Sequence, residues 1–126
     1  MNTPTYAQEH AAIVETVGKY IAGGTQADSA LMQPAFSEHA IMYSAKDGEL
    51  AGGPIARLFD TVDNRFVASP DALAAVTSVD IVGNAASVRL DIDGLSGSRF
   101  TDFFHLLKVE GEWKIISKIF HAHPAA

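Results

Sequence analysis

Asp102 is the carboxylate whose position in the sequence best suits acid–base chemistry. It stands among Phe100, Phe103 and Phe104 in a strand-like stretch, where aspartate is disfavoured. Because side chains alternate between the two faces of a strand, Asp102 shares its face with Phe104 and Leu106. An aspartate on an apolar face has a raised pKa and can act as a general acid or base. The alternative is a structural role, in which Asp102 bonds a neighbouring polar group or pairs with a lysine or arginine.

His121 is the second candidate for acid–base chemistry. It shares one face of the last strand with Ser117, and if that face is concave both residues line a pocket near its open end. A two-residue turn at 110–111 pairs Asp102 with Ile119, which puts Asp102 and His121 on one face. A three-residue turn with a bulge shifts the pairing by one residue and separates them. We expect the first arrangement; the alternative for His121 is a partly exposed histidine at a strand end.

The other candidates are aromatic residues and the remaining histidines. Aromatic residues are expected to form core or pocket wall, where a buried tyrosine hydroxyl needs a partner and can donate to a ligand carbonyl. We expect His105 on the opposite face, either structural or part of a dimer surface, and His39 in a loop. The spacing of His121 and His123 suits metal ligands, but no carboxylate is near in the sequence, so neither a metal nor another cofactor is predicted. The predicted ligand-binding residues are Tyr20, Phe36, Tyr43, Phe59, Phe104, Trp113 and Ser117.

Composition excludes several classes of function. A chain of 126 residues is the usual size of one domain, here 1–126, and the lack of cysteine excludes disulfides, thiolate metal sites and a cysteine nucleophile. A net charge of −6 without any run of lysine or arginine argues against nucleic-acid and membrane-surface partners. Residues 1–5 do not resemble a signal peptide, and no apolar stretch approaches the roughly 20 residues of a membrane span. We therefore expect a cytoplasmic globular protein.

The N-terminal segment predicts an amphipathic helix over residues 5–22. Thr5 with Gln8 fits a capping box, and Thr3 ahead of a proline fits an alternative N-cap. Gly23–Gly24 is expected to end this helix, because glycine accepts the left-handed conformation of a helix cap.

The rest of the chain predicts two more helices and a series of strands. Asp28 is expected to cap a short second helix. Residues 40–45 read as a strand, 46–49 as a hairpin turn before a brief return strand to about Ala51, and Gly53–Pro54 as the start of a third helix. From about residue 73 onward, alternating apolar residues and tight turns predict four strands, the last two covering 99–109 and 112–121. Helices followed by strands indicate an α+β fold, with a curved antiparallel sheet and a pocket between sheet and helices.

The closing segment carries a more specific pattern. It combines an Asp–aromatic pair at 102–103, a Leu-Leu-Lys run at 106–108, a Gly-x-Trp turn at 111–113 and a final Lys-x-Phe-His at 118–121. These motifs resemble the closing hairpin of the lumazine-binding group within the nuclear transport factor 2-like (NTF2-like) superfamily, which also contains the SnoaL-like cyclases, ketosteroid isomerase and scytalone dehydratase. The resemblance implies a cone-shaped, cystatin-like fold with three N-terminal helices on a strongly curved antiparallel sheet. It also implies a homodimer through the outer sheet face.

The resemblance leaves three functions open, because this fold hosts enzymes, binding modules and assembly domains. The first is a pocket that binds a small, largely apolar molecule. The second is an isomerase, dehydratase or cyclase in which Asp102 acts as acid or base while His121 or a tyrosine polarises a carbonyl. The third is a dimerisation or accessory module whose own side chains fill the pocket.

Overall fold

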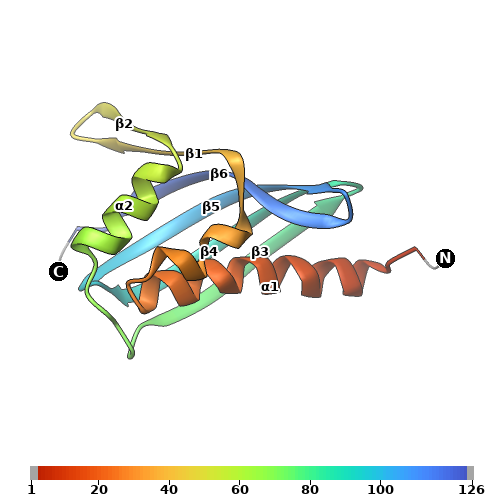
Figure 1. Ribbon diagram of the computed structural model, residues 1–126, viewed down its shortest axis with the longest axis horizontal. Coiled ribbons are helices and arrows are strands. Elements are labelled where there is room, and N and C mark those ends of the chain that lie inside the picture. Colours follow the sequence, from red (N-terminus) through yellow and green to blue (C-terminus); the bar gives the residue numbers. More distant parts are fainter. Residues whose placement is uncertain (1–2, 125–126) are drawn as a thin grey trace.

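The computed structural model describes residues 3–124, which form a six-stranded sheet and the helices that pack beside it (Figure 1). The helical segments are α1 (Tyr6–Thr25), the short 3-10 helices η1 (Ser29–Leu31) and η2 (Gln33–Ala35), and α2 (Ala56–Arg65). The strands are β1 (Phe36–Lys46), β2 (Glu49–Pro54), β3 (Leu73–Val82), β4 (Ala85–Leu95), β5 (Ser98–Val109) and β6 (Glu112–Ala122). The predicted α+β class is confirmed, as are the four strands that follow residue 73.

The sheet has the strand order β2-β1-β6-β5-β4-β3. Every neighbouring pair is antiparallel except β1 and β6, which run parallel. The sheet is therefore antiparallel as expected, with this one parallel pair as a detail that the sequence did not predict. Pairing of β1 with β6 joins the early hairpin to the late four-stranded meander. Helix α1 lies along one face of the sheet, and α2 lies near the β1–β2 hairpin (Figure 1).

Helix α1 begins as predicted but ends later. The backbone nitrogen of Gln8 donates to Thr5 Oγ1 at 3.2 Å, and that of Thr5 donates to Gln8 Oε1 at 2.9 Å, which completes the capping box. The helix then continues through Gly23 to Thr25, so the predicted end at Gly23–Gly24 is wrong. Gly23 is buried, and a Cβ there would lie 2.8 Å from Met32 Cβ. This glycine thus serves close packing rather than helix termination.

The helical segment after Asp28 and the β1–β2 hairpin are present as predicted, but the strands of the hairpin have other boundaries than predicted. Asp28 caps η1 by accepting from the Ala30 backbone nitrogen at 3.0 Å, and strand β1 begins at Phe36 rather than at residue 40. Gly52 and Gly53 have φ values of 151° and 153° and pair with β1, so they extend β2 instead of opening the third helix. A Cβ on Gly52 would lie 2.0 Å from a backbone oxygen of β1, and only glycine fits this crossing.

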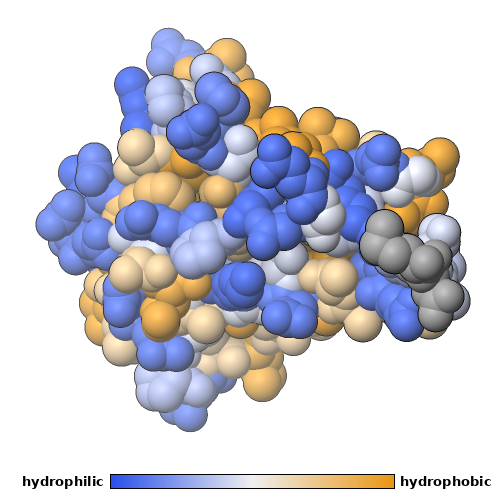
Figure 2. All heavy atoms as spheres, turned by 45° about the vertical axis from the view of Figure 1, so that its right-hand side comes forward, coloured by the Kyte–Doolittle hydropathy of each residue, from blue (hydrophilic) through white to orange (hydrophobic). Residues whose placement is uncertain are grey.

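The core lies between α1 and the concave face of the sheet. Alternate residues of β4, β5 and β6 are buried there against the apolar stripe of α1. The fully buried side chains include Ile13, Val17, Leu90, Phe104 and Ile115. On the face of the molecule in Figure 2, hydrophilic residues cover much of the surface and hydrophobic residues gather in separate patches. Among the described residues, no helix is long and apolar enough to cross a membrane.

Candidate functional site

Two charged side chains lie inside this core. Asp102 on β5 has no exposed surface, and Lys118 on β6 is 3% exposed. The Lys118 Nζ atom lies 3.5 Å from Asp102 Oδ1, so the two form a buried ion pair rather than a short hydrogen bond. Among the described residues, neither carboxylate oxygen of Asp102 has a hydrogen-bond partner. A buried charge pair without further hydrogen bonds is expensive to maintain, which is typical of a functional site.

Aromatic and thioether groups make up the rest of the environment of the Lys118 amine. Its Nζ atom lies 3.8 Å from the centre of the Phe120 ring and 5.6 Å from that of Tyr20. The Met42 sulfur is 3.9 Å away. These groups stabilise a cation far less than water does, so Asp102 is the main stabilising contact for a charged amine at this position.

This environment shifts three pKa values. Burial raises the pKa of Asp102, and the Lys118 charge opposes that rise. Burial lowers the pKa of Lys118, with Asp102 opposing the fall. The pKa values of acid and base therefore move toward each other. Burial and then the Asp102 charge raise the pKa of Tyr20 well above its usual value, which keeps its hydroxyl a hydrogen-bond donor.

An apolar pocket of about 220 Å³ adjoins the ion pair. Lys118 and Tyr20 line it, whereas Asp102 does not and lies behind them. Thr61 is the third polar side chain of the lining, and its hydroxyl donates to the Arg57 carbonyl at 2.9 Å. The remaining lining residues are Met42, Leu58, Phe66, Leu95, Phe100 and Phe120. The arrangement presents one amine and one phenol to an otherwise apolar cavity.

Asp102 faces the interior as predicted, but the prediction that His121 shares its face is wrong. The turn at 110–111 has the expected two residues, and the register it sets holds as far as the pair Leu106 and Ile115. The next pair is His105 with Ser117, so β6 carries one extra residue at this point. Such a bulge moves every later side chain of the strand to the other face.

Ile116 is the extra residue of this bulge, and the bulge changes which side chains of β6 point into the core. Lys118 and Phe120 turn inward, and Asp102 pairs with Phe120 instead of Ile119. His121 turns outward and is exposed. The structure therefore separates His121 from Asp102 and places Lys118 beside Asp102 instead.

The predicted ligand-binding residues divide into three groups. Tyr20 lines the pocket, and the rings of Phe36 and Phe104 pack edge-on against it with centroids 6.2 and 5.1 Å away. Phe59 packs in turn against Phe36, so these phenylalanines support the pocket from the core. Tyr43 is outside the lining because its neighbour on β1, Met42, points inward.

Trp113 and Ser117 also lie away from this pocket. Trp113 lines a separate hollow beside α1, and Ser117 lies in a hollow on the outer sheet face together with His105. His39 is exposed and belongs to β1 rather than to a loop. Tyr43, Trp113 and Ser117 therefore lie outside the pocket beside the ion pair. The expected loop position of His39 is wrong, whereas His105 lies on the face opposite Asp102 as expected.

Sequence reasoning missed Lys118, although the closing motif contains it. A lysine between Ile115-Ile116 and Ile119-Phe120 is unusual on a strand with apolar faces. Strict alternation of side chains along the strand places Lys118 on the solvent-exposed face. The bulge at Ile116 reverses that placement, and the sequence of hydrophobic and polar residues does not reveal the bulge.

Comparison with known proteins identifies the family. Residues 8–121 match the model of the family described as "Putative lumazine-binding". The chain belongs to this family of the NTF2-like superfamily.

Three relatives show how closely the NTF2-like chain follows known members. An NTF2-like protein of unknown function from Shewanella baltica OS155 is 56% identical, with a TM-score of 0.96 over 98% of this chain and 100% of that chain. Another, from Methylobacillus flagellatus KT, is 28% identical, with a TM-score of 0.88 over 98% and 99% of the two chains. A protein of Cladobotryum sp named aldolase FrzH is 29% identical over 122 residues, or 94% of each chain.

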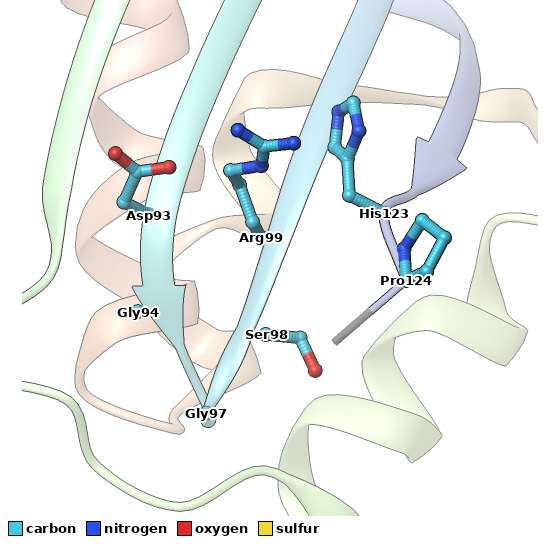
Figure 3. Close-up of a pocket in the computed structure, with 7 residues that line it drawn as sticks. All are labelled: Asp93, Gly94, Gly97, Ser98, Arg99, His123 and Pro124. Atoms are coloured by element: carbon cyan, nitrogen blue, oxygen red, sulfur yellow. The ribbon is translucent and has the colours of Figure 1, made fainter. Parts of the chain in front are cut away.

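A larger hollow, of about 520 Å³, lies on the surface of the NTF2-like fold near the turn between β4 and β5. Figure 3 shows the side chains of Asp93, Arg99 and His123 side by side along its edge. Asp93 and Arg99 are exposed. Because exposed charges are screened by water and keep ordinary reactivity, this hollow is a weaker candidate than the smaller buried pocket.

A hydrogen-bonded network of Asp91, Thr101 and His123 resembles a catalytic triad in composition only. The Thr101 hydroxyl donates to Asp91 Oδ1 at 2.7 Å and lies 2.8 Å from His123 Nε2. Since the hydroxyl proton is directed to Asp91, His123 must be the donor in the second bond. It therefore cannot remove the threonine proton as the base of a triad does. No group of three metal-ligating side chains occurs within residues 3–124.

Proposed function

We propose that this protein binds a small, largely apolar compound in the pocket beside the ion pair, with one acceptor oxygen of the ligand facing Lys118 and Tyr20. The observation that carries the proposal is the lining: an apolar wall with two buried donors at one place. Ligand sites typically combine an apolar wall with a few placed polar groups. A carbonyl oxygen suits this site, because both neighbouring groups donate hydrogen bonds.

Pocket size limits the ligand. An apolar cavity of about 150 Å³ accommodates benzene, and this pocket holds about 220 Å³. One ring with a short substituent, or a short chain, matches that volume. A pocket of this size also argues against the third function, a module whose own side chains fill the cavity.

A second candidate function is an enzyme of the isomerase, dehydratase or cyclase type. Its support is the Lys118–Asp102 pair, in which the pKa values of acid and base converge, and the similarity to a protein named as an aldolase. Here Lys118 would exchange protons with the ligand, and Asp102 would act through Lys118 as a positioning and proton-holding group. His121 has no part in this scheme, because it lies on the outer face.

Filling the pocket should abolish binding of a one-ring probe. Benzyl alcohol has an aromatic ring and one oxygen, and we expect it to raise the thermal unfolding temperature of the wild type in a concentration-dependent way. Thr61→Phe places a ring in the cavity from α2 and should remove that shift. The measurement is differential scanning fluorimetry with a benzyl alcohol titration.

Asn64→Phe is the matched control, because Asn64 is exposed on the same helix and is outside the pocket lining. It should retain the wild-type shift. Equal shifts in wild type and Thr61→Phe would contradict the proposal, as would the absence of any shift in the wild type.

We also propose that two copies pair through the outer face of the sheet. The support is a set of apolar side chains that point away from the core, with Phe103, Leu107 and Ile119 each exposed by more than 40%. Exposed apolar patches of this kind mark association surfaces. Sedimentation velocity at micromolar concentration should give the mass of two chains, and a single-chain mass over the whole accessible concentration range would refute this pairing.

A further inference from the structure

We propose that Lys118 is an amine nucleophile that forms a Schiff base with an aldehyde or ketone held in the pocket. This inference rests on the proposed binding function and adds a covalent step to it. Among the described residues, Lys118 is the amine that lines this cavity. Neither the acid–base scheme nor simple binding requires a carbon–nitrogen bond.

The position of the amine fits nucleophilic attack. Lys118 Nζ lies at the wall of the pocket, next to Phe120 on its own strand and Tyr20 on α1. The whole Lys118 side chain is buried beside the cavity that it lines, which limits the positions that the amine can take. A carbonyl carbon of a ligand in the pocket therefore meets the amine, and the Tyr20 hydroxyl can donate to the carbonyl oxygen.

The protonation state also fits. A lysine attacks only as the neutral amine, and a desolvated lysine in an apolar pocket is a recognised form of activated nucleophile. Burial lowers the pKa of Lys118 and raises that of Asp102. Asp102 is thus placed to hold the proton that Lys118 gives up, at a distance of 3.5 Å. The titratable groups that face the amine are Asp102 and Tyr20.

The proposed step balances without any oxidant or reductant. The nitrogen lone pair forms the C–N bond while the carbonyl π electrons move to oxygen, which takes a proton from the Tyr20 hydroxyl. One N–H proton of the new ammonium returns to that donor, giving a neutral carbinolamine. Loss of the hydroxyl as water, together with the second N–H proton, leaves the imine. Amine and carbonyl thus give imine and water.

Reductive trapping tests this inference. The wild type is incubated with benzaldehyde at pH 7 and treated with sodium borohydride, which adds hydride to the imine carbon and fixes it as a secondary amine. We expect intact-mass spectrometry to show a gain equal to the mass of benzaldehyde less one oxygen. Peptide mapping should place that gain on Lys118. Because burial lowers the pKa of Lys118, more of its amine is neutral at pH 7, and Lys118 should label about tenfold or more over exposed Lys46.

Two variants complete the experiment. Lys118→Arg keeps a cation beside Asp102 but cannot form an imine, and its labelling at this position should vanish, whereas Lys46→Arg should label Lys118 as the wild type does. If Lys118 in the wild type labels no more than Lys46, the inference is overturned, whatever the variants do. A benzyl alcohol shift without Lys118 labelling would leave the binding proposal standing and reject the covalent step, while absence of both would reject the two together.

Discussion

Lys118→Met is expected to lower the free energy of unfolding by about 3 kcal/mol, because it leaves the Asp102 carboxylate buried without its counter-charge. Methionine matches the length and flexibility of the lysine stem, so packing changes little. The loss therefore measures the penalty of an unpaired carboxyl in the core. Urea unfolding at pH 7, followed by circular dichroism, measures it.

The double variant Asp102→Leu/Lys118→Met should recover that loss. Removing both partners leaves two apolar side chains of similar volume, and such replacements are often neutral or stabilising by about 1 to 4 kcal/mol. Lys46→Met, at the exposed β1–β2 turn, is the matched control and should change the free energy by about 0.5 kcal/mol or less.

Recovery in the double variant would show that the ion pair is retained for a purpose other than stability. That result fits a site in which Lys118 acts on a ligand, because functional groups are often held at the expense of stability. A double variant as unstable as Lys118→Met would instead mean that the pair organises the core. The proposals for Lys118 would then lose this support.

Much of the fold follows from local rules that need few distant contacts. The capping box of Thr5 and Gln8 is a local signal. The alternation of side chains along a strand is another, and it correctly predicts that Asp102 and Phe104 share the interior face. The strong curvature of the sheet was predicted from the family resemblance of the closing hairpin, because the alternation of side chains carries no information about curvature. These elements depend on neighbours within a few residues, which is why the sequence predicts them.

The candidate site was only half predictable, because it depends on register. One extra residue at Ile116 decides whether Lys118 or His121 reaches Asp102, and alternation alone does not reveal a bulge. Gly23 shows the same limit in another form. Glycine there reads as a helix end, while its actual role is close contact with Met32 on a later segment. Both cases are decided by partners distant in the sequence.

Phe104→Ala is expected to lower the free energy of unfolding by about 3 to 5 kcal/mol, the usual cost of removing a fully buried aromatic ring. The Phe104 ring packs edge-on against Tyr20 with centroids 5.1 Å apart. Its loss should also loosen the tyrosine that lines the pocket. We therefore expect the variant to weaken the benzyl alcohol shift as well as stability, which urea unfolding and the same ligand titration measure.

Phe103→Ala is the control that the strand itself provides. Phe103 is the adjacent residue on the opposite face, 45% exposed, with Arg89 above its ring at 5.9 Å. Its removal should change stability by about 1 kcal/mol or less and leave benzyl alcohol binding intact. Unfolding across a dilution series separates any contribution from pairing of two copies, since that contribution depends on concentration. Similar losses in the two variants at high dilution would contradict the assignment of Phe104 and Asp102 to the interior face. The placement of Lys118 beside Asp102, on which the proposals for Lys118 rest, would then have to be abandoned as well.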